Sequence, residues 1–137
     1  MLTKQISIFV ENRTGRLAEI ATLLAENDIN LRSLSVADTS RFGVLRIIVD
    51  DPYSVEKLLK EKGFAVSITS VVSVRMDDRP GGLAEVLMVL ANNGINVEYM
   101  YAFRASNNEA YVIMRVDNDL AAQDVLVKAG YKGYCKF

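Results

Sequence analysis

The stretch Arg13-Thr14-Gly15-Arg16-Leu17-Ala18-Glu19-Ile20 decides the fold, because the chain of 137 residues contains it twice. It returns 66 positions later as Arg79-Pro80-Gly81-Gly82-Leu83-Ala84-Glu85-Val86. The likeness extends to Asn30 and Asn96, and 10 of the 18 aligned positions are identical in the two copies. Because self-similarity at a fixed spacing indicates a repeat architecture, the chain is interpreted as two copies of one small unit.

The spacing between the copies grows by one residue in the middle of the unit. Gly63-Phe64 matches Gly130-Tyr131 at an offset of 67. Loops tolerate insertions, so the extra residue between Thr39 and Gly43 predicts a hairpin tip there. We expect two domains, residues 1–70 and 71–137, joined with almost no linker.

Each copy contains the same order of strand and helix patterns. Apolar residues alternate along the first strand, as in Ile6 and Ile8, and recur at helical spacing from Leu17 onward. A hairpin, a short helix and a last strand follow, with last strands expected over residues 65–70 and 132–137. The order β-α-β-β-α-β predicts an α+β fold of two tandem ferredoxin-like units, each an antiparallel sheet with both helices on one face. Units this small have small cores, so we expect the two to pack together.

The helix ends carry recognisable residues in both copies. The first helix of each copy should end at Asn27-Asp28 and at Asn93-Gly94, where Asn and Gly suit a left-handed backbone. The second helix of each copy should begin after Asp51 and after Asn118, since both residue types cap helix N-termini.

The second strand of the unit differs between the copies. Its inner face is expected to carry Leu34 and Val36 in the first copy, and Met100 and Ala102 in the second. Outward-facing aromatic residues favour an interface, in a homodimer or against the other half. One alternative is that a tyrosine covers the side chain of a ligand beside Asn96. Another is that the rings stack on the bases of a nucleic acid. These outward residues are Tyr99, Tyr101 and Phe103, where the first copy has Ser33, Ser35 and Ala37.

The composition argues against several kinds of chemistry. The chain has no His, which excludes catalysis by a Ser-His-Asp or Cys-His arrangement and a His-ligated metal. Its single cysteine, Cys135, cannot close a disulfide within the chain or build a thiolate metal site. The net charge is −1 and no basic run stands out, so nucleic acid is not an expected partner. We expect no cofactor, no metal and no catalytic activity.

The hydropathy pattern argues against a membrane partner. No apolar stretch approaches the roughly 18 residues that a membrane-spanning helix needs. The N-terminal residues Met1–Gln5 do not resemble a signal region. We therefore expect a cytoplasmic protein.

The repeated glycine turn is the candidate ligand site. A glycine turn that leads into a helix exposes backbone N–H groups and the positive end of the helix dipole, which suit a carboxylate. Asn12 and Asp78 lie on these turns and can accept a hydrogen bond from an ammonium group. The alternative is that Asn12 and Asp78 only cap the helices that follow.

The turn motif and the Asn-x-Ile-Asn motif that follows it resemble the ACT domain. They stand as Asn12–Glu19 with Asn27–Asn30, and again as Asp78–Glu85 with Asn93–Asn96. The resemblance covers nearly the whole chain and implies a regulatory module that binds a free amino acid between paired domains. The ligand-binding residues that it implies are Asn12, Arg13, Thr14, Gly15, Arg16, Leu17 and Asn30, and then Asp78, Arg79, Pro80, Gly81, Gly82, Leu83 and Asn96.

The two turns predict one or two unequal sites. Thr14 replaces the proline found at Pro80, so the first turn is less rigid, and Asp78 brings a negative charge that suits an ammonium group. The sequence predicts an amino-acid sensor whose ligand lies between the repeats and whose changed packing signals to a partner enzyme or a second copy. A small ferredoxin-like enzyme that depends on Arg13, Arg79 or Asp78 is one alternative, and a ligand-free assembly module is the other.

Overall fold

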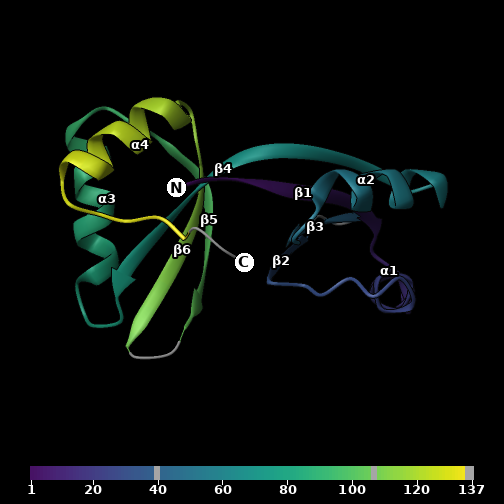
Figure 1. The fold of residues 1–137 in the computed structure, drawn as a ribbon. Coiled ribbons are helices and arrows are strands. Elements are labelled where there is room, and N and C mark those ends of the chain that lie inside the picture. Colours follow the sequence, from purple (N-terminus) through teal and green to yellow (C-terminus); the bar gives the residue numbers. More distant parts are fainter. Residues whose placement is uncertain (39–40, 106–107, 135–137) are drawn as a thin grey trace. The chain divides into compact units, whose positions relative to one another are not determined.

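The computed structural model describes residues 1–38, 41–105 and 108–134 (Figure 1). The chain divides into two compact units. Lys4–Thr69 form one, called here the N-terminal unit, and Met1–Thr3 with the described residues of 70–134 form the other, the C-terminal unit.

The N-terminal unit contains β1 (Leu2–Glu11), α1 (Arg16–Glu26), β2 (Ser33–Asp38), β3 (Phe42–Ile48), α2 (Pro52–Glu61) and the first part of β4 (Ala65–Asp77). Its strand order is β2-β3-β1-β4, and β3 pairs antiparallel with both β1 and β2. Ile20 from α1 and Leu59 from α2 share a core with Ile6 and Ile47, which are cross-strand partners. Both helices therefore pack on one face of the sheet.

The C-terminal unit continues β4 and adds α3 (Gly82–Asn92), β5 (Val97–Arg104), β6 (Glu109–Val116) and α4 (Asp119–Lys128). Its strand order is β4-β6-β5, with both pairs antiparallel. The helices α3 and α4 lie on the same side of this sheet (Figure 1). The predicted α+β fold of two ferredoxin-like units is confirmed.

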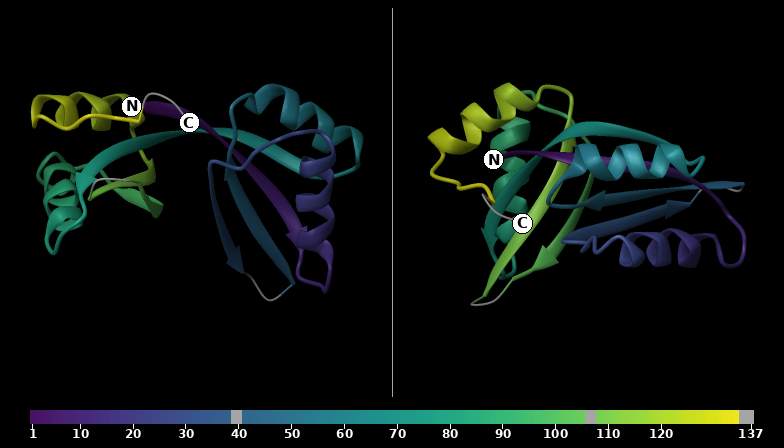
Figure 2. Two further views of the ribbon diagram at one scale, coloured as in Figure 1. Left: turned by 60° about the horizontal axis from the view of Figure 1, so that its bottom comes forward. Right: turned by 45° about the vertical axis from the view of Figure 1, so that its right-hand side comes forward.

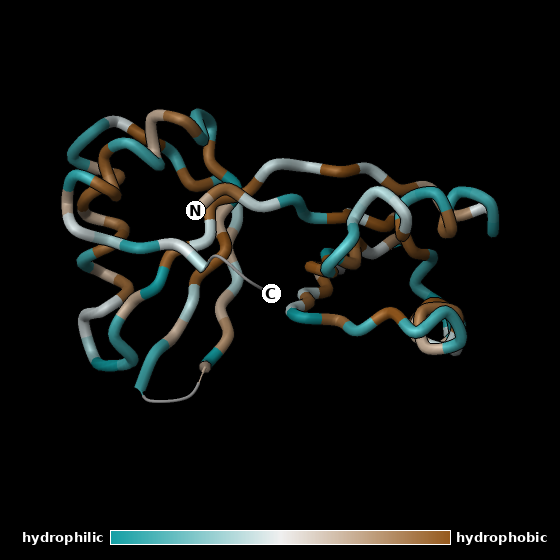
Figure 3. The backbone as a smooth tube through the Cα atoms, viewed as in Figure 1, coloured by the Kyte–Doolittle hydropathy of each residue, from teal (hydrophilic) through white to brown (hydrophobic). Residues whose placement is uncertain are grey.

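Each unit has its own buried core, built from alternating apolar residues of the strands and one apolar side of each helix (Figure 3). In the N-terminal unit, Ile8 of β1 and Leu59 of α2 are fully buried. In the C-terminal unit, Val74 of β4 and Leu126 of α4 are their counterparts and are also fully buried. The core that positions each glycine turn is thus repeated along with the turn.

The turns at the helix ends follow the sequence prediction. The second helices α2 and α4 begin as expected, because Asp51 accepts a hydrogen bond from the Ser54 N–H and Asn118 from the Ala121 N–H. The first helices are bounded by left-handed residues at both ends. These are Gly15 and Gly81, with φ of 85° and 89°, and Asp28 and Gly94, with φ of 56° and 69°.

The predicted inner-face residues of the edge strands face the helices but are not buried. Leu34 is the cross-strand partner of the core residue Ile47. Leu34 and Val36 are nevertheless 53% and 51% exposed. Because β2 and β5 lie at the edges of the strand order, the helices cover the inner strands and leave the edges open. Met100 and Ala102 on the other edge strand, β5, are exposed for the same reason.

The last strand of each repeat also differs from the prediction. In the first copy the expected strand over residues 65–70 continues without a break into the next repeat, and β4 is one strand of 13 residues (Figure 2). In the second copy, Tyr131–Tyr134 form no strand, and the remaining residues of the predicted strand, like the hairpin tip at 39–40, lie outside the described residues. The Met1 carbonyl accepts a hydrogen bond from the Ser73 N–H, so the start of the chain already pairs with β4 there. The Lys132 carbonyl accepts another from the Arg75 N–H.

Candidate functional site

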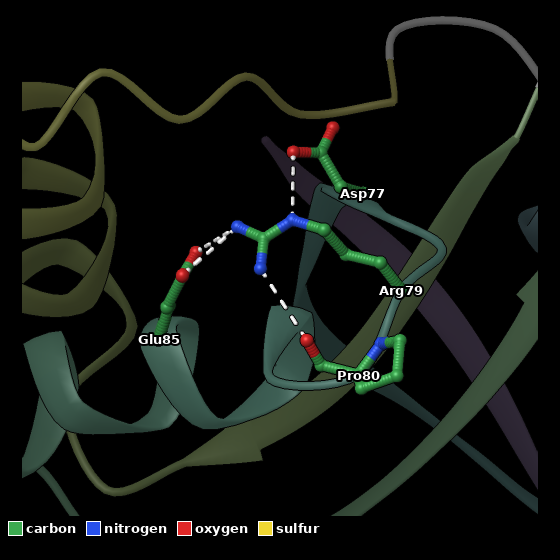
Figure 4. Close-up of polar contacts among 4 residues, drawn as sticks. All are labelled: Asp77, Arg79, Pro80 and Glu85. Atoms are coloured by element: carbon green, nitrogen blue, oxygen red, sulfur yellow. Dashed lines mark hydrogen bonds and ion pairs between the residues drawn. The ribbon is translucent and has the colours of Figure 1, made fainter.

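The glycine turn of the C-terminal unit is held by one arginine, Arg79 (Figure 4). Its Nη2 donates to both carboxylate oxygens of Glu85, at 2.9 and 2.8 Å. Its Nε lies 3.5 Å from a carboxylate oxygen of Asp77, and its Nη1 donates to the Pro80 carbonyl at 3.4 Å. The hydrogen bond to Glu85 is the main reason that the pKa of Arg79 is raised above its usual value. Arg79 thus ties the end of β4 to the first turn of α3.

Two adjacent glycines serve this turn for different reasons. Gly81 has φ of 89°, a left-handed conformation that costs little only for glycine. Gly82 has an ordinary backbone, but a Cβ at that position would collide with the carbonyl oxygen of Asp77. Gly82 also donates its N–H to the Arg79 carbonyl at 3.0 Å, which holds the two backbones close.

The turn of the N-terminal unit has a second arginine at the position of Gly82. Arg13 repeats the role of Arg79, with Nε 3.1 Å from Glu11 and Nη2 3.6 Å from Glu19. Arg16 donates from Nη1 to Glu19 at 2.6 Å, and its guanidinium carbon lies 4.4 Å from the centre of the Phe64 ring. The hydrogen bond from Arg16 is the main cause that lowers the pKa of Glu19.

A pocket of about 330 Å³ opens beside the turn of the C-terminal unit. Burial raises the pKa of Tyr131, which is one of the lining residues. The lining comes from the end of β4, the start of α3 and the segment after α4, and consists of Arg75, Met76, Asp77, Gly82, Glu85, Gly130, Tyr131 and Lys132. This pocket combines cationic, acidic and aromatic side chains in one unit.

A smaller and more apolar pocket of about 70 Å³ lies beside the turn of the N-terminal unit. Three of the predicted site residues, Asn12, Arg13 and Leu17, line it together with Val36 of the edge strand β2. The two turns therefore present different surfaces, and the predicted inequality of the two ligand sites stays a prediction.

Asn12 and Asp78 do not cap the helices. The N-cap positions of α1 and α3 are Gly15 and Gly81, and neither helix has a side-chain cap. Asp78 instead forms an ion pair with Arg104 of β5, with 2.6 Å between the Arg104 Nε and a carboxylate oxygen. The capping alternative was wrong, and an ammonium ligand at Asp78 would share the carboxylate with Arg104.

Asn30 and Asn96 lie at the opposite end of their units from the turns. Asn96 immediately precedes β5, and its N–H donates to Asp117 at 3.1 Å. Arg104 is the last residue of β5, and it contacts Asp78 on the turn. Seven residue steps along a strand span roughly 23 Å. Asn30 lines another pocket, of about 140 Å³, next to Asp50. Within a unit, the structure does not bring these asparagines to the turn.

The outward aromatic residues of β5 form a cluster on the sheet face away from the helices. Phe103 is the cross-strand partner of Tyr111, and their rings stack at 5.4 Å between centroids. Tyr134 packs edge-on against Tyr111 at 4.5 Å. Tyr99 and Tyr101 continue the row and are half-buried. Burial is also the main cause that raises the pKa of Tyr111.

Of the residues that line the larger pocket, the sequence predicted Gly82 as a site residue and missed Glu85 and Tyr131. The signal that pointed to them was the repeat itself, since Glu19 and Phe64 hold the same positions in the first copy.

Residues 1–38, 41–105 and 108–134 contain neither a metal-binding cluster nor a membrane-spanning helix. No group of three or more His, Cys, Asp or Glu residues in this part of the chain could hold a metal ion. No helix there is long and apolar enough to cross a membrane.

Two ferredoxin-like units in one chain, each with a glycine turn before its first helix, define the class of tandem ferredoxin-like proteins. Within this class, the chain belongs to the family of ACT domain pairs, whose model matches residues 1–133. No match was found among curated proteins.

Several solved structures are similar to this chain. Protein BT0572 from Bacteroides thetaiotaomicron is 45% identical, with a TM-score of 0.91, over 96% of this chain and 91% of that one. The ligand-free regulatory subunit of aspartate kinase from Thermus thermophilus is 18% identical, with a TM-score of 0.65, over 94% of this chain and 97% of that one. The corresponding subunit from Thermus flavus is 19% identical, with a TM-score of 0.66, over 95% of each chain. At 18–19% identity the likeness shows the fold alone.

Proposed function

We propose that this chain is a regulatory module that binds a free amino acid and acts on a partner protein, without catalysing a reaction itself. The observation that carries the proposal is the pocket of about 330 Å³ beside the turn of the C-terminal unit. Its volume lies in the range of small-molecule sites. Its walls carry the cations Arg75 and Lys132 and the carboxylates Asp77 and Glu85. A zwitterionic amino acid has one group for each of these two kinds of side chain.

The family supports the regulatory part of the proposal. ACT domain pairs are regulatory modules that bind amino acids, and two solved structures of similar fold are regulatory subunits of aspartate kinase. The partner proposed here is an enzyme or a second copy of the chain. The predicted position of the ligand between the repeats, and the predicted signal by changed packing, stay predictions.

The contacts of the turn arginines favour regulation over catalysis. The enzyme alternative depends on Arg13, Arg79 or Asp78, and Asp78 is paired with Arg104. Arg79 is tied to Glu85 and Asp77, and Arg13 to Glu11 and Glu19, so both guanidinium groups brace their own turns. Such arginines hold a binding site in shape, and their replacement should loosen the turn.

The edge of the N-terminal unit supports a homodimer or another protein partner. Leu34, Val36 and Phe42 are each about half exposed on or beside the edge strand β2, and Leu17 of α1 is 45% exposed. Exposed edge strands with apolar neighbours are prone to pair with another chain. We propose that a second copy covers this edge.

The test of the amino-acid proposal is a thermal-shift measurement with each of the twenty amino acids. A ligand at 100 times its dissociation constant should stabilise the fold by about 2.7 kcal/mol, which raises the melting temperature by several degrees. The absence of a shift with all twenty would contradict the proposal.

Variants of the two turns then assign the site. Asp78→Ala and Asn12→Ala should weaken binding unequally, and unchanged affinity in both would remove the turns from the site. Arg104→Ala is the matched control, because it breaks the same ion pair but leaves the Asp78 carboxylate in place. A loss in Asp78→Ala alone assigns the carboxylate to the ligand.

A further inference from the structure

The N-terminal unit shows what fits the position of the open pocket. The repeat aligns Arg16 with Gly82, Glu19 with Glu85 and Phe64 with Tyr131. In the N-terminal unit the Arg16 guanidinium lies over the Phe64 ring at 4.4 Å and bonds Glu19 at 2.6 Å. The Arg16 side chain is only 22% exposed, so most of it is covered at this position. A guanidinium group therefore already occupies one copy of the position.

The C-terminal unit keeps the two partners of this guanidinium and lacks the guanidinium itself. Gly82 contributes no side chain, and Glu85 and Tyr131 line the pocket of about 330 Å³. The Asp77 carbonyl stands where a Cβ of residue 82 would lie, so the backbone of this turn excludes the side chain that fills the other copy. The pocket is thus built into the turn.

The acidic residue of the C-terminal unit holds one guanidinium fewer than its counterpart. Glu19 contacts Arg16 through one carboxylate oxygen and Arg13 through the other. Both oxygens of Glu85 accept from the same nitrogen of Arg79. An ionised carboxylate has about four acceptor positions, so Glu85 can take a second cationic donor from the pocket side.

We propose that the pocket of the C-terminal unit binds a free amino acid through a guanidinium group on its side chain, and that Arg16 fills the equivalent position in the N-terminal unit, so that each chain binds one such ligand. The guanidinium lies over the ring of Tyr131 and bonds Glu85. Lys132, also in the lining, is placed to receive the α-carboxylate. This inference names the ligand class of the module and rests on the proposed function.

The first experiment measures binding to the full chain by isothermal titration calorimetry. The probes are L-arginine, L-citrulline, whose urea group has the same shape without the charge, and methylguanidinium as the side-chain group alone. L-arginine should bind at one equivalent per chain and L-citrulline at least about tenfold more weakly, because hydrogen bonds between charged groups are about twice as strong as neutral ones. Equal binding of the two would overturn the inference.

The repeat supplies matched variants for this experiment. Glu85→Gln should weaken L-arginine about tenfold or more, whereas Glu19→Gln should leave its affinity unchanged. Tyr131→Leu should weaken it about threefold by removing the ring beneath the cation. Equal effects of Glu85→Gln and Glu19→Gln, with melting temperatures near that of the natural chain, would overturn the assignment.

The second experiment opens the filled position. Arg16→Ala should raise the number of bound L-arginine molecules from one to two per chain. Arg16→Ala should also lower the melting temperature, and added methylguanidinium should reverse part of this decrease. Arg32→Ala is the control, because it removes an arginine that is paired with Asp50 in the same unit, and methylguanidinium should not restore it. Two equivalents bound by the natural chain, or one by Arg16→Ala, would show that Arg16 does not occupy the equivalent site.

The outcomes separate this inference from the proposed function. If another amino acid binds and L-arginine does not, the guanidinium assignment fails and the regulatory module stands. If none of the twenty amino acids binds, the proposed function fails. If methylguanidinium alone binds and Glu85→Gln abolishes this, the pocket chemistry stands while the free amino acid as its ligand is wrong.

Discussion

Replacing Gly82 by alanine adds one methyl group at the point where the two units differ most. Residue 82 is the first residue of α3, and its backbone has an ordinary helical region conformation, so alanine is not disfavoured by φ. Helix propensity by itself favours alanine over glycine by up to about 1 kcal/mol. The added Cβ would, however, meet the carbonyl oxygen of Asp77, a backbone atom that cannot rotate away.

The steric effect should outweigh the gain in propensity. Overpacking a buried position by one or a few carbon atoms costs typically about 1–3 kcal/mol. Gly82 is buried, and its N–H is bonded to the Arg79 carbonyl, so the turn can move only by lengthening that hydrogen bond. Because the atom that the Cβ meets belongs to the backbone, the cost should lie near the upper end of this range, and subtracting the propensity gain leaves a net loss of about 2 kcal/mol in the free energy of unfolding. The strain should also loosen the ion pair between Arg79 and Glu85.

Urea denaturation with an unchanged m-value measures this loss, and two variants isolate its parts. Gly94→Ala adds a methyl group in open space at a positive φ of 69°, so it reports backbone strain without collision. Ala84→Gly, at an exposed position of α3, reports propensity alone and should cost about 0.5–1 kcal/mol. A Gly82→Ala chain as stable as the natural one, or more stable, would refute the steric argument.

The remaining predictions concern caps, cores, pH and the exposed edge. Asp51→Ala and Asn118→Ala should each cost about 1 kcal/mol in urea denaturation, because each removes an N-cap hydrogen bond, and an effect in neither would contradict the cap assignment. Leu59→Ala and Leu126→Ala, at 0% exposure in the two cores, should each cost about 2–5 kcal/mol, and a small loss in either would show that its core collapses around the cavity. The hydrogen bond from Arg32 is the main cause that lowers the pKa of Asp50 in the folded chain. The ion pair therefore stabilises the fold above the pKa that Asp50 has in the unfolded chain, and this stabilisation is lost as the pH falls through the lower pKa of the folded chain. The urea concentration at the unfolding midpoint should decrease when the pH falls below about 4, and it should decrease less steeply in Arg32→Ala. Leu34→Ser with Val36→Ser should leave the melting temperature nearly unchanged and lower the mass seen by light scattering, and an unchanged dimer mass would remove this edge from the interface.

Local features of the fold were predictable from the sequence because they depend on short stretches of chain. The N-caps at Asp51 and Asn118 and the left-handed ends at Asp28 and Gly94 follow from residue type and position alone. The order of elements followed from the repeat and from the change between periods of two and 3.6. These features repeat in both units since each copy carries the same local signals.

Features that depend on which strands lie side by side were not predictable in the same way. The pattern that places Leu34 on the inner face does not say that β2 lies at the edge of the sheet, where no helix covers it. The predicted last strand of the second copy was wrong over its described residues Lys132–Tyr134, because Met1 already pairs with β4. A periodic pattern reports the direction of side chains, and only the fold decides which strand takes each place.

The candidate site shows the same division between local and spatial information. The turn motif is nearly identical in the two copies, and from it the sequence predicted unequal sites on the basis of Thr14 and Asp78. The structure adds a larger difference nearby, where Arg16 lies over the ring of Phe64 in one unit, and Gly82 and Tyr131 line a pocket in the other. In the sequence alignment, the difference between Arg16 and Gly82 gives no signal of a site, because the aromatic residue Phe64 that Arg16 contacts lies 48 positions away. The two copies therefore share the acid and the aromatic residue, and where the first copy has an arginine bonded to that acid, the second has a glycine beside a pocket.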